Sequence, residues 1–314
     1  MKIKNKCQNI AILGAGRIGS YIAAKFIESK THKIHLLARG NYADIEKSGI
    51  ILTNGNSNKV IKEGFTLYNS ISDLPPCNLI IMAVPTSQNS NLLSTLNLPL
   101  YNSSTKIVTL QNGLLFEDEI TKRIPKHCTL YSGTCWIKIS QIEPGHIRHD
   151  FGNNIKLGRY MPNQQNVQIQ KKDQEIQKIF KEIGFDTDLI VNIQSVQLTK
   201  TALNLPFFTI VTKTGYTIPE ILASSTLNIE RMLLQEEIIN TAQSIGSLVD
   251  KVLIDKITDA LKTIPIKIPS SRQKIVENMK KETLGFIEKL IHFAHKHNHT
   301  LPLIEMEYRK LQSI

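Results

Sequence analysis

The chain has 314 residues, of which 41% are hydrophobic and 21% are charged, and its formal net charge is +11. This length favours two domains over a single core, and the composition is ordinary for a soluble globular protein. The basic residues are scattered with no RRM, KH or zinc-finger pattern, which argues against a nucleic-acid partner, and no apolar run approaches the roughly 18 residues that a membrane span needs.

The start of the chain and its cysteines indicate a cytoplasmic protein. Four cysteines show no CxxC pair and no metal-ligand spacing, so we expect reduced thiols and no metal. The opening MKIKNKCQNIAILGAG is basic and then apolar. Its apolar part is short and runs directly into a glycine loop, which favours a first β-strand over a signal peptide.

The segment QNIAILGAGRIGSYIAAKFIES predicts a nucleotide-binding unit, because a strand over Asn9 to Leu13 leads through a glycine loop into a helix. Gly14 permits the tight turn, Gly16 lets the backbone approach a pyrophosphate, and Gly19 allows close packing of helix on strand. The N–H groups at the start of the helix then face the phosphates. The alternative is a chance glycine turn, which the following strand disfavours. The predicted cofactor-binding residues of the loop are Gly14, Ala15, Gly16, Arg17, Ile18 and Gly19.

The second strand, KIHLLARGN, predicts which dinucleotide is bound. Dinucleotide sites specific for NAD carry an acid at the end of this strand, where it binds the ribose hydroxyls. Here Arg39 takes that place, and a guanidinium suits a 2′-phosphate in charge and in bidentate geometry. We therefore predict NADPH as the cofactor, the alternative being a solvated loop arginine.

Further strands follow at β/α spacing. CNLIIMAVPTSQ has the continuous apolar character of a buried strand and is stopped by Pro85, and KIVTLQNGL is another such strand. Ligands of doubly wound sheets gather beyond the carboxyl ends of strands, so Val84, Pro85, Gln88 and Asn112 are expected to reach the cofactor. The alternative for Gln88 and Asn112 is a role in a turn. The next segment, with short alternating strands broken by EPGH and FGNN, predicts an antiparallel extension of the sheet.

The second half of the chain is helix-like. The predicted domains are residues 1–190, a Rossmann-type nucleotide-binding domain, and residues 191–314, an all-α domain with 3.6-residue periodicity. In the connection IPIKIPSSRQ, Ser270 or Ser271 is expected to cap the next helix. The cluster of His292, His295, His297 and His299 suggests zinc, but a helix end without Cys or acid ligands favours a structural role.

One apolar helical stretch, VQLTKTALNLPFF, carries Lys200 and Asn204 one turn apart. Residues four apart share a helix face, so an ammonium and a carboxamide project together. Beside a nicotinamide, that ammonium could stabilise the charge that develops on a carbonyl oxygen and then supply a proton. The asparagine could orient the substrate, and Glu282 of another helix is a candidate to hold the lysine. The alternative for Lys200 is a side chain that extends to water.

Eight segments together resemble the 2-dehydropantoate 2-reductases, or ketopantoate reductases, over nearly the whole chain. They are GAGRIG, LLARG, LQNG, EPGHIRH…IKLGR, KTALN, PSSRQ, KKETLGFIEKL and HNHTLP. The resemblance implies a Rossmann domain that binds NADPH, a helical domain that closes over it, and reduction of 2-dehydropantoate to (R)-pantoate, a precursor of pantothenate and coenzyme A. It implies Lys200 as the catalytic lysine, Asn204, Asn112 and Ser270 as substrate-binding residues, and Glu282 as the functional glutamate that also meets the cofactor.

The chain departs from the family pattern at four positions. Pro85 stands where the family usually has a lysine, and Phe208 replaces a second substrate asparagine. Leu198 replaces an aromatic residue, and Lys274 replaces an aspartate. One interpretation is that a site lined by Phe208 accepts a bulkier or more apolar 2-oxo acid, and the alternative is that other side chains replace the missing contacts in a divergent ketopantoate reductase.

Three functions follow as hypotheses. The first is NADPH-dependent reduction of a small 2-oxo acid, with ketopantoate as the leading candidate. The expected partner is this small-molecule substrate, and a homodimer is possible. The second is a related oxidoreductase, such as an opine or 3-hydroxy acid dehydrogenase. The third is a non-catalytic NADP(H)-binding regulator whose basic charge serves nucleic acid.

Overall fold

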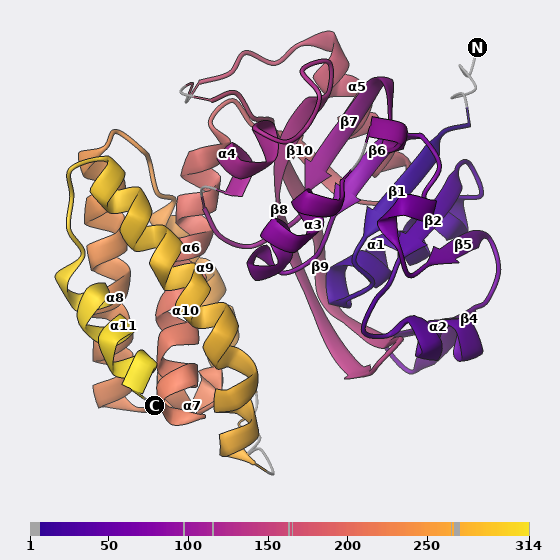
Figure 1. Cartoon of the computed structure of the whole chain (residues 1–314). Coiled ribbons are helices and arrows are strands. Elements are labelled where there is room, and N and C mark those ends of the chain that lie inside the picture. Colours follow the sequence, from indigo (N-terminus) through magenta and orange to yellow (C-terminus); the bar gives the residue numbers. More distant parts are fainter. Residues whose placement is uncertain are drawn as a thin grey trace. The chain divides into compact units, whose positions relative to one another are not determined.

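The computed structural model describes residues 7–96, 98–114, 116–162, 164, 166–264, 266 and 271–313. The chain divides into two compact units (Figure 1). The first comprises Met1–Gln111 and Glu117–Ile193, and the second comprises Asn112–Phe116 and Gln194–Ile314. The segment 112–116, which the sequence placed in the first domain, thus groups with the helices.

The first unit is built on one sheet of ten strands. The strands are β1 (Asn9–Leu13), β2 (Lys33–Leu37), β3 (Ile50–Asn54), β4 (Ser57–Ile61), β5 (Phe65–Tyr68), β6 (Cys77–Met82), β7 (Tyr101–Thr109), β8 (Thr129–Glu143), β9 (His146–Arg159) and β10 (Asp186–Leu189). The helices are α1 (Arg17–Ser29), α2 (Tyr42–Ser48), α3 (Asn89–Thr95), α4 (Phe116–Thr121) and α5 (Lys171–Glu182), with a short 3₁₀ turn over Thr86–Gln88.

Six parallel strands of this sheet lie in the order β5-β2-β1-β6-β7-β8. This is the strand order of a Rossmann sheet, in which the direction of winding reverses between the first and fourth strands. Here that reversal lies between β1 and β6, and the carboxyl ends of these two strands are where such sheets bind ligands. The predicted fold class is confirmed, and β1 has the predicted bounds.

The antiparallel extension is also present, in a different form from the one predicted. β8 and β9 form one long hairpin that turns at Pro144 and Gly145, as EPGH predicted. The prediction that FGNN breaks a strand is wrong, because these residues lie inside β9. Gly152, at φ +81°, faces the Trp136 carbonyl so closely that a Cβ there would lie 2.2 Å from its oxygen, and the register shifts nearby. The glycine therefore bends the strand without ending it.

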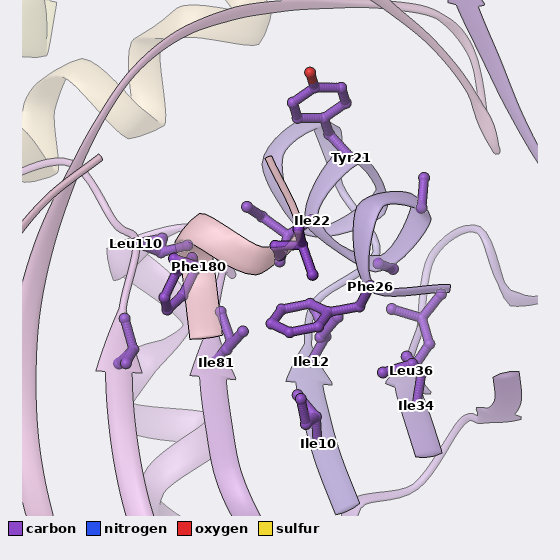
Figure 2. Close-up of a cluster of buried hydrophobic side chains, with 14 of the residues drawn as sticks. Ile10, Ile12, Tyr21, Ile22, Phe26, Ile34, Leu36, Ile81, Leu110 and Phe180 are labelled. Atoms are coloured by element: carbon purple, nitrogen blue, oxygen red, sulfur yellow. The ribbon is translucent and has the colours of Figure 1, made fainter. Parts of the chain in front are cut away.

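The core of the first unit comes from alternate residues of the parallel strands. Ile10 and Ile12 of β1 and Ile34 and Leu36 of β2 point to the same side, where they meet helix side chains (Figure 2). Phe26 of α1 packs edge-on against Phe180 of α5, with ring centroids 6.0 Å apart. All of these side chains are buried, and burial of each contributes about 1.5–3 kcal/mol relative to exposure. The sheet and the helix that follows the glycine loop are thus held rigidly together.

The second unit is helical. Its helices are α6 (Ile193–Thr214), α7 (Ile218–Ala223), α8 (Ser225–Ser244), α9 (Lys251–Lys262), α10 (Arg272–Lys296) and α11 (Pro302–Ser313). None of the helices in the described part of the chain combines the length and the apolar composition that a membrane span requires.

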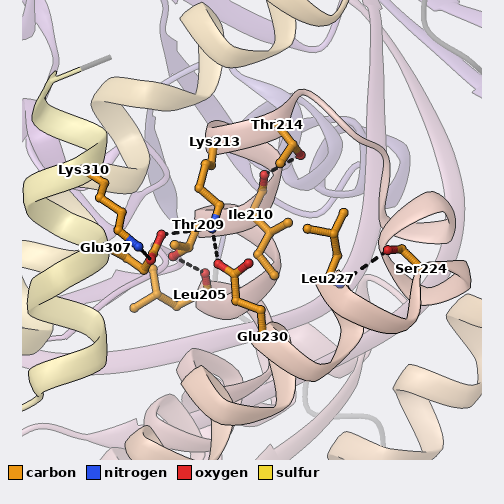
Figure 3. A network of polar contacts seen from close by, with 10 residues as sticks. All are labelled: Leu205, Thr209, Ile210, Lys213, Thr214, Ser224, Leu227, Glu230, Glu307 and Lys310. Atoms are coloured by element: carbon orange, nitrogen blue, oxygen red, sulfur yellow. Dashed lines mark hydrogen bonds and ion pairs between the residues drawn. The ribbon is translucent and has the colours of Figure 1, made fainter.

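Charged side chains join three of these helices (Figure 3). Lys213 of α6 donates to Glu230 of α8 and, over 3.2 Å, to Glu307 of α11. Lys310 donates to Glu307 over 2.7 Å, so this buried carboxylate has two cationic partners. Desolvation raises the pKa of Glu307, but hydrogen bonds from Lys310 and Lys213 outweigh it, and the net pKa is lowered. The network fixes the end of α6 that is distant from Lys200.

Candidate functional site

The glycine loop connects β1 to α1 with the geometry that the sequence predicted. Gly14 has φ +109°, which disfavours other residues, and a Cβ there would lie 2.8 Å from Cγ1 of Val84. A Cβ on Gly19 would lie 1.8 Å from the Gly14 carbonyl oxygen, so the helix packs directly on the turn. Gly16 differs: it is exposed, and a Cβ there would meet nothing within 4 Å. No atom of the described residues fills the space beside Gly16, so a ligand could approach the backbone there.

The start of α1 suits an anion. Gly16 occupies the N-cap position without a side-chain cap, and the first turn of α1 holds no acidic residue. The first N–H groups of a helix have no partner within it and carry the positive end of the helix dipole. Arg17, the first residue of α1, is exposed and adds a full positive charge. This end of α1 could therefore bind phosphate groups.

Two side chains anchor the loop through the carbonyl oxygen of Ala15. Ser20 Oγ donates to it over 2.9 Å, and Asn41 Nδ2 donates to it over 2.5 Å. Asn41 follows β2, and Arg39 lies two residues before it, exposed just beyond the end of that strand. The loop that carries Arg39 is thereby tied to the glycine loop, and a role of Arg39 toward a 2′-phosphate stays a prediction. The sequence prediction missed Asn41, for which the signal was an amide shortly after a strand end.

A buried amide pair holds the loops after β6 and β7. Gln111 Nε2 donates to the Val84 carbonyl oxygen over 2.6 Å and to Asn89 Oδ1 over 2.7 Å. Asn89 Nδ2 donates back to Gln111 Oε1 over 3.3 Å. Both residues are buried, whereas the predicted residues Gln88 and Asn112, each one position away, are exposed. Asn89 and Gln111 build this edge of the sheet, and a ligand role for Gln88 and Asn112 stays a prediction.

The residues after β6 complete this edge. Val84 is half-buried, and its backbone N–H would lie 3.0 Å from a Cβ on Gly14. Pro85 is exposed and begins the short 3₁₀ turn, in which its carbonyl oxygen accepts a hydrogen bond from the Gln88 N–H over 2.9 Å. The structure thus brings together Gly14, Val84 and Gln111 from the ends of three adjacent strands.

Lys200 and Asn204 lie on one stripe of α6 in the second unit. Both are half-buried, while Thr201, Ala202, Leu203 and Leu205 around them are buried. The stripe therefore carries two polar side chains that are less buried than the residues around them. The segment that holds Asn112 belongs to the same unit, and the Lys289 ammonium of α10 lies 5.8 Å above the ring of Phe116 in that segment.

Two contacts fix the register of α6 against α10. The rings of Phe208 and Phe286 meet edge-on at 6.3 Å, and the hydroxyls of Thr212 and Thr283 are 2.8 Å apart. Glu282 precedes Thr283, so it lies opposite a part of α6 about 18 Å from Lys200 along the axis, at 1.5 Å per residue. This register gives no support to the interpretation that Glu282 holds Lys200, and a role of Glu282 toward the cofactor stays a prediction.

The remaining residues that the sequence singled out, the two serines and the histidine cluster, lie at or near the two ends of α10. Ser271 caps this helix by accepting a hydrogen bond from the Lys274 N–H over 3.2 Å, so the capping role falls to it. Ser270 lies outside the described residues. His295 pairs with Glu305 and His299 with Ser244, and no group of side chains able to hold a metal ion occurs within the described part of the chain.

Fold and site together define a Rossmann-type sheet that carries a glycine loop of the dinucleotide-binding pattern, with an appended helical unit. Residues 10–162 match the family model described as ketopantoate reductase PanE/ApbA. A 2-dehydropantoate 2-reductase from a Nostoc species is 25% identical over 305 residues, which are 96% of this chain and 93% of that protein. The resemblance predicted from the motifs is therefore confirmed: the chain is similar to the ketopantoate reductases over nearly its whole length.

Solved structures share the whole fold. The 2-dehydropantoate 2-reductase from Geobacter metallireducens superposes with a TM-score of 0.83 at 21% identity, over 97% of this chain and 99% of the other. D-mandelate dehydrogenase in a ternary structure with NADH and anilino(oxo)acetate has a TM-score of 0.74 at 18% identity, over 97% of each chain. The fold of this chain thus occurs in proteins with different names.

Proposed function

We propose that this protein is an NADPH-dependent reductase of a 2-oxo acid, with 2-dehydropantoate as the first candidate substrate and (R)-pantoate as its product. One observation carries the proposal: Lys200 and Asn204 stand one turn apart on the half-buried stripe of α6, in the same compact unit as Asn112. The glycine-loop edge of the other unit supplies the features of a dinucleotide site. Production of pantoate would place the protein in pantothenate and coenzyme A synthesis.

The residues would divide the chemistry as follows. NADPH, when bound, supplies a hydride to the carbonyl carbon of the 2-oxo acid. The Lys200 ammonium stabilises the negative charge that develops on the carbonyl oxygen and donates the proton that completes the hydroxyl group. The amides of Asn204 and Asn112 orient the substrate carboxylate, which raises the fraction of encounters with the correct geometry.

The cofactor edge would be held by the residues described above. The backbone N–H groups of residues 17–19 bind the pyrophosphate, and Arg39 binds the 2′-phosphate. Val84, Pro85 and Gln88 line the nicotinamide side of the crevice, and Glu282 contributes from α10. Two of the similar structures contain NADH. A comparison of NADPH with NADH as cofactors of this protein therefore tests the assignment of Arg39 directly.

The experiment is steady-state oxidation of NADPH with 2-dehydropantoate by the wild-type protein and by Lys200→Ala. We expect kcat/KM to fall by about 10²-fold or more in the variant, because a positioned general acid contributes 10²–10⁴-fold. Lys256→Ala, which removes an exposed lysine of α9, serves as the matched control and should retain full activity. Retention of full activity by Lys200→Ala would refute the catalytic role.

The alternatives give different results in the same assay. A related dehydrogenase of an opine or other oxo acid would oxidise NADPH with another member of a substrate panel. A non-catalytic NADP(H)-binding regulator would bind NADPH without turnover on any oxo acid and would bind DNA tightly in a salt-dependent way.

A further inference from the structure

Phe208 continues the stripe that Lys200 and Asn204 begin. It lies one turn beyond Asn204 on α6 and is half-buried like both of them, whereas Leu205, Pro206 and Phe207 between are buried. Residues at positions i, i+4 and i+8 share one face of a helix. An ammonium, a carboxamide and an aromatic ring therefore face the same space on successive turns.

The ring of Phe208 is held in place from α10. Phe286, which is only 6% exposed, meets it edge-on with a centroid distance of 6.3 Å and an interplanar angle of 61°. One turn further along α6, the hydroxyl pair of Thr212 and Thr283 joins the same two helices, and Thr283 is fully buried. The Phe208 ring thus belongs to a packed helix pair, and a phenyl ring offers neither a hydrogen-bond donor nor an acceptor.

This arrangement makes one end of the stripe polar and the other apolar. A substrate whose polar groups meet Lys200 and Asn204 lies one helical turn, about 6 Å, from Phe208, so the substituent on its carbonyl carbon can reach the ring. A hydroxyl group on that substituent would lose its water and find no partner on the ring, which lowers the affinity about tenfold, or about 1.4 kcal/mol. A hydrocarbon substituent loses nothing there and gains contact with the ring.

Resting on the proposed reductase function, we propose that Phe208, supported by Phe286, is the specificity-determining residue of this site. It selects 2-oxo acids with a branched or aromatic hydrocarbon substituent over those with a hydroxyl group on that substituent. The substrate class is then a hydroxyl-free 2-oxo acid, and the product is the corresponding 2-hydroxy acid.

Trimethylpyruvate tests this selection because it is 2-dehydropantoate without its hydroxyl group. We expect the wild-type protein to reduce trimethylpyruvate with a kcat/KM about tenfold above that for 2-dehydropantoate. Phe208→Asn should shift the ratio of the two values at least tenfold toward 2-dehydropantoate. Phe208→Leu, which keeps the wall apolar, should leave the ratio within about threefold of the wild-type value.

The outcomes separate this inference from the proposed function. A wild-type preference for 2-dehydropantoate by tenfold or more would overturn the role of Phe208 and leave the reductase function intact. An unchanged ratio in a Phe208→Asn variant that still binds NADPH would also overturn it. Failure of the wild-type protein to reduce any 2-oxo acid of the panel would refute the reductase function and this inference with it. The wild-type ratio needs no variant, so the test stands even if Phe208→Asn does not fold.

Discussion

Asn89 and Gln111 exchange hydrogen bonds through their side-chain amides, at 2.7 and 3.3 Å, in a buried position beside the glycine loop. Gln111 also donates to the carbonyl oxygen of Val84, the residue that a Cβ on Gly14 would strike. The turn after β1 packs closely on the loop after β6 at Val84. Gln111, which follows β7, holds that loop through its hydrogen bond to Val84. Three strand ends are therefore coupled through one amide pair.

Replacing Gln111 by Met should destabilise the fold and weaken cofactor binding together. The variant keeps the shape of the side chain but leaves the amide of Asn89 and the carbonyl of Val84 without their partner, at a cost of about 1–3 kcal/mol for each buried group. Urea unfolding should show this loss, and the Kd of NADPH should rise. Gln174→Met, at an exposed position of α5, is the matched control and should change neither value. A double-mutant cycle with Asn89→Leu should give a coupling energy of about 1 kcal/mol or more, and additive effects would show that the pair is not coupled.

Two glycines of the loop should respond in opposite ways to alanine. Gly16 has φ −77° and an open Cβ position, so Gly16→Ala should fold with an unchanged Tm but bind NADPH at least about tenfold more weakly, since the methyl group occupies the space of the pyrophosphate. In Gly19→Ala the new Cβ would lie 1.8 Å from the Gly14 carbonyl oxygen. That variant should lose about 1–3 kcal/mol of stability or more. Thermal unfolding and NADPH titration distinguish the two, and a lowered Tm in Gly16→Ala would contradict the assignment.

The sequence predicted the parts of the fold whose signals are local. The run of apolar residues, glycine loop and helix at the start of the chain identified β1 and α1, and the apolar runs identified β6 and β7. By contrast β4 and β10 are short and their sequences, SNKVI and DTDL, contain few hydrophobic residues, so neither shows the apolar pattern that predicts a strand. Their formation depends on pairing with β3 and β9, which no local pattern reveals.

The candidate site shows the same limit at the scale of single residues. The sequence indicated that polar residues after strands reach the ligand crevice, and it selected Gln88 and Asn112. In the structure their neighbours Asn89 and Gln111 are the buried ones. Which of two adjacent amides points inward depends on the dihedral angles of the turn, such as φ +115° at Gly113, and on partners that come from another strand.

Arg39→Ala should discriminate between the two dinucleotides. If the guanidinium binds the 2′-phosphate, the Kd of NADPH should rise by about 10–100-fold, because a charge-assisted hydrogen bond contributes about 1.5–3 kcal/mol. The Kd of NADH should change little. Lys33→Ala removes the same charge at the opposite end of β2, about 20 Å away at 3.3 Å per residue, and should leave both values unchanged. An equal loss for NADPH and NADH in Arg39→Ala would overturn the assignment of NADPH.

Acid should weaken the helical unit through the ion pair of Glu220 with Arg272. Arg272 donates to both carboxylate oxygens of Glu220, over 2.6 and 3.2 Å, and the Thr217 N–H adds a third hydrogen bond over 2.8 Å. These hydrogen bonds, those from Arg272 first, lower the pKa of Glu220 from 4.5 to about 2.

Because the pKa is lower in the folded than in the unfolded protein, the stabilisation is complete above pH 4.5 and is lost as the pH falls from there toward 2. Glu220→Gln should therefore be less stable than the wild-type protein at neutral pH, and this difference should shrink across that window. Urea unfolding of both proteins at neutral pH and near the lower end of the window measures it. Glu236→Gln, at an exposed position of α8, is the control and should show no such dependence. A difference between Glu220→Gln and the wild-type protein that stays constant with pH would show that the ion pair does not stabilise the turn between α6 and α7.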